Sequence, residues 1–275
     1  MSFQPVLPLG GLAGLRFLDR TLDRQSAAFV QAPEIQRNTD HFRARIGQID
    51  TAAALVSDRR VLEVALGAFG LQDDLGNRFF IRKVLEEGTL SADALANRLA
   101  DPRYAEFARA FGFGDFATPR TQLSDFADDI VARYETRSFE VAVGRQDESL
   151  RLALEARRAL GEIAGSDATE RTKWFQVLGA PPLRKVFETA FGLPAAFATL
   201  DIDRQADEMQ ARAARAFGGD SIGQFSDPDR VEALVRRFLA QAQLAAGPPA
   251  SAPGMAALSL LQSTGSARSI LEALY

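Results

Sequence analysis

The chain has 275 residues, of which 47% are apolar and 25% are charged, a balance typical of a globular protein with a substantial core. Its formal net charge of -4 argues against a nucleic-acid partner, because phosphate binding needs a concentrated basic surface. Cysteine is absent, which excludes disulfides, thiolate metal sites and cysteine nucleophiles.

The N-terminal stretch has no basic region, and prolines interrupt its apolar residues, so we expect no cleaved Sec signal. No window approaches the ~20 apolar residues that a membrane span needs. The cytoplasm is therefore the expected compartment, and export without a cleaved signal is the alternative.

Helix-favouring residues dominate the chain, and alternating strand patterns are missing, so the sequence predicts an all-α fold. An apolar stripe from Leu15 to Phe29 predicts the first helix, and Pro33 predicts the start of the second. Further helices are predicted at 51–55, from Asp58 to Gly70, from Asp73 to Gly88, from Ser91 to Leu99 and from Asp101-Pro102 to Gly112.

The longest helical region is predicted to begin at Pro119 and to continue to Ile163. A single helix of that length would span roughly 65 Å, at about 1.5 Å per residue, which exceeds an ordinary domain helix. We therefore predict two long helices with a break near Gly144–Asp147, and one continuous spine is the alternative. Later helices are predicted to end at Gly179, to start at Pro181 or Pro182 and end at Gly192, and to cover 201–217 and 227–245.

Two motifs recur in the same order and at similar spacing, which predicts an internal duplication. Ala68-Phe69-Gly70-Leu71 recurs as Ala190-Phe191-Gly192-Leu193, and Asp101-Pro102 recurs as Asp227-Pro228. Phe-Gly-Leu at a helix end is a capping motif, so it marks structure and not a site. The predicted organisation is two pseudo-repeated helical halves linked by long helices: 1–118 with the first copy, 119–165 as connecting helices, 166–246 with the second copy, and 247–275 as a Gly/Pro linker with C-terminal helices.

No catalytic, cofactor or metal site is predicted. His41 is the only histidine, so a multi-histidine metal site cannot form, and no nucleophile motif accompanies it. The adjacent acidic pairs point about 100° apart on a helix and do not converge. Most of the 20 phenylalanines fall at helical spacing, which is typical of core packing.

Several blocks of sequence resemble the bacterial family called domain of unknown function 1217, and the likeness runs from Gly10 to Leu261. These blocks are Gly14–Leu18, Leu55–Arg60, Val64–Leu71, Phe79–Glu86 and Tyr134–Gly144. The family occurs largely in alphaproteobacteria, and some members lie in flagellar gene clusters. The resemblance therefore implies work at the flagellum, and it implies no catalytic residues.

The leading hypothesis is a non-enzymatic, flagellum-associated assembly factor or minor structural protein that acts through helix-mediated contacts with protein partners. It would reside in the cytoplasm or at the flagellum. Tethered amphipathic helices often dock on a partner, whereas the simpler interpretation, which we favour for the tail, is packing on the body of the same chain. The candidate contact residues are Tyr134, Arg137 and Phe139 in one block and Leu258, Leu261, Ile270, Leu271 and Leu274 in the tail.

Two alternatives stay open. An enzyme or small-molecule binder could hold an anion in a pocket between helices, lined by Arg82, Lys83 and Tyr134. An exported rod-like or hook-like component fits less well, because such proteins usually carry heptad-rich ends and these ends are interrupted.

Overall fold

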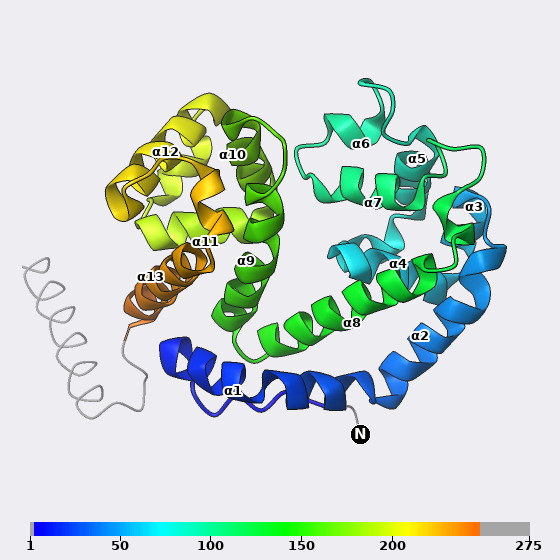
Figure 1. Cartoon of the computed structure of the whole chain (residues 1–275), viewed down its shortest axis with the longest axis horizontal. Coiled ribbons are helices and arrows are strands. Elements are labelled where there is room, and N and C mark those ends of the chain that lie inside the picture. Colours follow the sequence, from blue (N-terminus) through cyan, green and yellow to red (C-terminus); the bar gives the residue numbers. More distant parts are fainter. Residues whose placement is uncertain (1–2, 248–275) are drawn as a thin grey trace, which may run out of the picture.

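The computed structural model describes residues 3–247, and every regular element within them is helical (Figure 1). The described residues form thirteen α-helices, which confirms the predicted all-α class. None of these helices combines the length and hydrophobicity needed to cross a bilayer. The tail residues Leu258, Leu261, Ile270, Leu271 and Leu274 lie outside the described range, so the contacts predicted for them stay predictions.

Seven α-helices form the first half of the described chain. They are α1 (Gly11–Val30), α2 (Pro33–Arg45), α3 (Ala52–Ser57), α4 (Arg59–Phe69), α5 (Arg78–Glu87), α6 (Leu95–Arg98) and α7 (Arg103–Phe111). Asp58 caps α4 as predicted, because its carboxylate accepts hydrogen bonds from the backbone N–H groups of Arg60 and Val61. The same helix ends at Gly70, whose φ of 71° is a left-handed conformation that favours glycine.

Two helices in this half begin later than predicted. Asp73 lies in a 3₁₀ turn, Gln72–Gly76, and α5 begins only at Arg78. The neighbouring Asp74 carboxylate is held by the hydroxyl of Tyr104 at 2.6 Å, which favours the turn over a helix start. The helix predicted from Ser91 is reduced to the single turn of α6, because Asp115 accepts hydrogen bonds from the backbone of the preceding segment.

Two long helices lie at the centre of the molecule, α8 (Phe126–Gly144) and α9 (Glu148–Ala164). The predicted break is confirmed, since Asp147 caps α9 by accepting from the N–H groups of Ser149 and Leu150. The predicted start at Pro119 is wrong: a short 3₁₀ turn follows it, and the Thr121 hydroxyl donates to the carbonyl of Ile49 at 2.6 Å. In Figure 1, α8 and α9 meet at an angle, with the first half beside α8 and the second beside α9.

The second half consists of α10 (Glu170–Gly179), α11 (Pro181–Phe191), α12 (Ile202–Phe217) and α13 (Pro228–Ala246), close to the predicted bounds. The repeated motif ends α4 at Gly70 and α11 at Gly192, both with positive φ. Each of these helices packs along one of the central pair, α4 along α8 and α11 along α9. The duplication itself stays a prediction.

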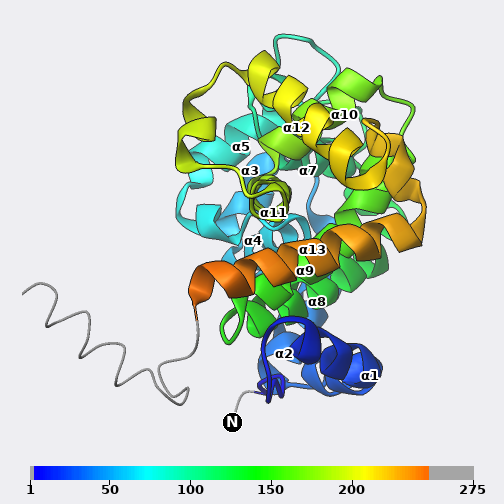
Figure 2. The ribbon, with the colours of Figure 1, turned by 90° about the vertical axis from the view of Figure 1, so that its left-hand side faces the viewer.

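A continuous cluster of buried apolar side chains extends from α1 to α13. Phe29 on α1 packs edge-on against Phe139 on α8, with ring centroids 5.7 Å apart. Figure 2 shows α1 and α2 crossing below α8, α9 and α13. The N-terminal helices thus brace the central pair and close one side of the space beside α8.

Candidate functional site

One face of α8 lines two adjoining hollows. Tyr134, Ser138, Val141 and Arg145 follow one another at steps of three or four residues, so their side chains share this face. Arg137 lies beside them. Arg137, Val141 and Arg145 line both hollows, which places this stretch of α8 at the boundary between them.

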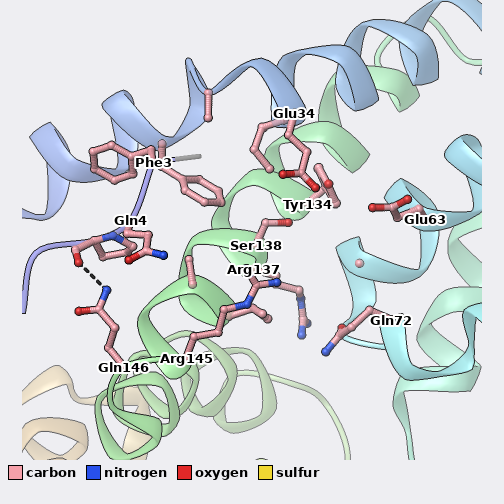
Figure 3. Close-up of a pocket in the computed structure, with 17 residues that line it drawn as sticks. Phe3, Gln4, Glu34, Glu63, Gln72, Tyr134, Arg137, Ser138, Arg145 and Gln146 are labelled. Atoms are coloured by element: carbon pink, nitrogen blue, oxygen red, sulfur yellow. Dashed lines mark hydrogen bonds between the residues drawn. The ribbon is translucent and has the colours of Figure 1, made fainter. Parts of the chain in front are cut away.

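The first hollow, here called the enclosed pocket, has a volume of about 300 Å³ and lies between α8, α2, α4 and the N-terminal segment. Its walls are partly apolar, and its polar side chains come from five parts of the chain, including Gln72 in the 3₁₀ turn after α4 (Figure 3). The wall residues used below are Phe3, Phe29, Ala32, Glu34, Ile35, Glu63, Tyr134, Arg137, Ala142 and Arg145.

A buried amide organises one end of the enclosed pocket. The Asn38 side chain, 8% exposed, donates from Nδ2 to Glu63 Oε1 and to the Tyr134 hydroxyl, both at 3.3 Å. Burial raises the pKa of Tyr134, and the nearby carboxylates of Glu63 and Glu34 raise it further. The Tyr134 hydroxyl therefore stays neutral, and the carboxylates give this end a negative potential.

Arg137 occupies the boundary between the hollows. Its side chain is only 13% exposed, and its sole ionic contact among residues 3–247 is with Glu155 at 4.0 Å. Burial lowers the pKa of Arg137, and the positive charge of Arg158 lowers it further. A guanidinium carries five N–H donors, and this one donates no hydrogen bond to residues 3–247. Arg137 therefore has donors to offer a ligand.

The second hollow, here called the charged groove, has a volume of about 620 Å³ and lies between the two halves, with α8 and α9 at its base. Many of the side chains that line it are charged. The basic members are Arg103, Arg137, Arg145, Arg151 and Lys185, and the acidic members are Asp73, Glu140, Glu148 and Glu155.

Much of this charge is already paired. Arg151 bridges Glu148 and Glu155 at 2.5 and 2.8 Å, and the buried Glu140 is held by Arg158 from outside the groove. Arg145 and Lys185, by contrast, form no ion pair with any residue in the range 3–247. The groove therefore offers two unpaired basic side chains, Arg145 and Lys185, beside the exposed Asp73, and the charge of the whole lining is nearly balanced.

The predicted contact residues of α8 have different surroundings. Arg137 faces both hollows, and Tyr134 lines the enclosed pocket while being 6% exposed. Phe139 is 3% exposed and packs in the core against Phe29, so its ring is not available to a partner. The resemblance block thus contains both a core residue and a largely buried arginine that borders the two hollows.

The anion pocket predicted from Arg82, Lys83 and Tyr134 does not form. Arg82 and Lys83 lie on α5 and pair with Glu86 and Glu87, one turn further along the same helix. Neither lines the enclosed pocket or the charged groove, whereas Tyr134 lines the enclosed pocket. The arginines that line the two hollows along α8 are instead Arg137 and Arg145.

Sequence reasoning missed Arg145, Glu63 and Lys185. Arg145 could have been found from its spacing, since it lies on the same face of α8 as Tyr134. Glu63 and Lys185 come from α4 and α11, and only the packing of those helices brings them to the hollows.

No grouping of three metal-ligating side chains occurs among residues 3–247. His41 Nε2 lies 2.8 Å from Asp58 Oδ2, but that carboxylate is also the cap of α4. The His41–Asp58 pair therefore links α2 to the start of α4, and this contact gives both side chains a structural role.

Comparisons with known proteins give a family and a fold. The family model described as "Protein of unknown function (DUF1217)" matches residues 68–231. A protein from Agrobacterium tumefaciens has a crystal structure similar to this chain, with a TM-score of 0.71 and 25% sequence identity. The similarity covers 86% of this chain and 97% of that one. No functionally curated protein matches the chain.

Proposed function

The chain belongs to the DUF1217 family, and on this basis we propose that it is a non-enzymatic, flagellum-associated protein that holds an acidic segment of a protein partner in the charged groove. The flagellar setting is supported by the resemblance to a family with members in flagellar gene clusters. The contact itself is supported by the chemistry of the groove.

Two unpaired basic side chains in the groove carry this proposal. Arg145 directly follows α8 and Lys185 lies on α11, and neither has an acidic partner within residues 3–247. Unpaired basic side chains in a groove attract acidic segments and favour one orientation of the bound chain. The groove is open enough to admit a chain from solvent, and it draws on both halves of the molecule.

A double charge reversal tests the groove as the contact surface. Tagged protein carrying Arg145→Glu and Lys185→Glu would be used to recover partners from motile cells, beside the wild type. Arg236→Glu is the matched control, because Arg236 is exposed on α13 and forms no ion pair within residues 3–247. We expect a flagellar protein to be recovered by the wild type and the control and lost by the double variant. Equal recovery by all three would contradict the proposal.

The tail provides a second predicted contact surface through Leu258, Leu261, Ile270, Leu271 and Leu274. Deleting residues 250–275 and repeating the recovery separates its role from that of the groove. An unchanged set of recovered proteins would contradict a role for the tail and would leave the groove as the contact surface.

The enclosed pocket favours a second function, the binding of a small molecule. Small-molecule sites are typically concave and mostly apolar, with a few polar groups that fix the ligand. The pocket beside α8 has this character, with phenylalanine side chains on its walls and charged groups at its ends.

A further inference from the structure

We propose that the enclosed pocket binds a free amino acid with an apolar side chain, whose carboxylate pairs with Arg137 and Arg145 and whose ammonium group pairs with Glu34 and Glu63. The inference rests on the second proposed function, small-molecule binding. It does not rest on the flagellar setting, and it shares Arg137 and Arg145 with the charged groove, whose lining they also form.

The basic end of the pocket is suited to a carboxylate. The Arg137 side chain is 13% exposed, and its 4.0 Å contact with Glu155 is too long for a hydrogen bond. A guanidinium presents a planar fork that matches a carboxylate in two parallel hydrogen bonds. Arg145, which directly follows the last residue of α8, adds a second positive charge that has no ionic partner within residues 3–247.

The opposite end is suited to an ammonium group. Glu63 is held in place by the buried Asn38, which also fixes the Tyr134 hydroxyl, so two oxygen acceptors lie together. Glu34 on α2 adds a second carboxylate, and neither glutamate forms an ion pair with residues 3–247. Figure 3 shows Glu34 and Glu63 at one end of the pocket and Arg145 at the other.

Apolar side chains form a large part of the pocket wall. Phe29, Ala32, Ile35 and Ala142 contribute to its walls, and Phe3 closes it with its ring edge-on to Phe29 at a centroid distance of 6.3 Å. The closing segment is anchored by the Gln146 side chain, which donates to the carbonyl of Pro5 at 2.5 Å (Figure 3). An apolar side chain of the ligand would lie against these walls.

The separation of the charges selects a zwitterion over a ligand with one charge. A carboxylate alone would leave Glu34 and Glu63 without a partner, and an amine alone would leave the arginines without one. Charged groups that a ligand desolvates and does not pair cost affinity. A volume of about 300 Å³ also lies at the small end for ligand sites, which favours an amino acid over an extended peptide.

Isothermal titration calorimetry on the full-length chain tests the ligand class. The probes are L-leucine and L-phenylalanine, with leucinamide and N-acetyl-L-leucine as derivatives that each lack one charge. We expect at least one of the two amino acids to bind and the derivatives of leucine to bind about tenfold more weakly than leucine or worse. The proposal is overturned if neither amino acid binds at millimolar concentration, or if N-acetyl-L-leucine binds as well as leucine.

Variants locate the site. Arg137→Gln and Glu63→Gln should each weaken amino-acid binding about tenfold or more, because each removes one of the two groups that pair with a ligand charge. Arg145→Gln should weaken amino-acid binding as well, and this exposed residue can be changed without risk to the core.

Arg236→Gln and Glu135→Gln are the controls. Their side chains lie outside the pocket, so both variants should leave amino-acid binding unchanged. Folded Arg145→Gln and Glu63→Gln variants with wild-type binding would overturn the proposal, whatever the behaviour of Arg137→Gln. Since the motility and recovery experiments do not involve amino-acid binding, their failure is distinguishable from failure here.

Discussion

Arg158 on α9 reaches across the break between the central helices to Glu140 on α8, with Nε and Nη2 at 3.0 and 3.1 Å from the two carboxylate oxygens. The Glu140 side chain is 8% exposed. Burial lowers the pKa of Arg158, but the hydrogen bonds and charge of Glu140 outweigh it and leave that pKa raised. Since a two-point contact between planar groups fixes their orientation, this pair holds α8 at its angle to α9.

Replacing Arg158 by Met should lower the free energy of unfolding by about 3 kcal/mol, because the Glu140 carboxylate is left buried without its partner. The control is Arg212→Met, which removes an exposed pair with Glu208 at 2.7 Å and should cost about 0.5 kcal/mol or less. Urea unfolding followed by circular dichroism measures both variants. Similar losses in the two would contradict the bracing role of the Arg158–Glu140 pair.

Two glycine-to-alanine changes should shift stability in opposite directions. A methyl group at Gly67 on α4 would lie 2.8 Å from Cδ2 of Tyr134, whose ring is buried and whose hydroxyl is held by Asn38. Gly67→Ala should therefore cost about 1–3 kcal/mol through overpacking. Gly161 lies inside α9 with no atom within 4 Å of an added methyl, so Gly161→Ala should stabilise by up to about 1 kcal/mol. Thermal unfolding midpoints that move in the same direction would contradict the close approach of α4 to α8.

The Asp58 carboxylate should make the stability depend on pH. Its burial would raise the pKa, but the hydrogen bond with His41 and those from the backbone of Val61 and Arg60 hold the pKa of Asp58 below its ordinary value of 3.8. Because the pKa of Asp58 is lower in the folded state, its carboxylate adds stability at pH values above the unfolded-state pKa. This stability is lost as the pH falls through the folded-state pKa.

The substitution Asp58→Asn keeps a side-chain oxygen that can cap α4 and removes the negative charge. The variant should be less stable than the wild type at neutral pH, and the difference should shrink below about pH 3.8. Urea titrations across this range that show a constant difference would exclude the charge as the cause.

Helix ends were the most predictable part of the fold, because their causes are local. Gly70 and Gly192 end their helices through positive φ, and Asp58 and Asp147 cap theirs through hydrogen bonds to residues two or three positions on. Each of these residues lies within a few positions of the helix end that it determines, so a short stretch of sequence contains both.

The missed helix starts have distant causes. Tyr104 holds Asp74 in a turn from 30 positions away, and Thr121 reaches the carbonyl of Ile49 from 72 positions away. No local window contains both partners, so propensity and capping residues predicted helices where tertiary hydrogen bonds favour turns.

Some residues of the candidate site could be predicted from the sequence, and others could not. The block Tyr134–Gly144 was chosen from resemblance, and it contains Arg137, the boundary residue between the two hollows. The pairing of Arg82 with Glu86 one turn later could have been read from the spacing, and it removes that arginine from any pocket. The contributions of α2, α4 and α11 depend on how the helices pack around α8, which the periodicity of one helix does not encode.

The most direct test of the flagellar proposal is a clean in-frame deletion in the native host, scored by swimming in soft agar and by filament counts in electron micrographs. We predict impaired swimming: missing filaments would indicate a role in assembly, and normal filaments without swimming would indicate a role at the motor. Normal swimming with normal filaments would contradict the proposal that this protein works at the flagellum.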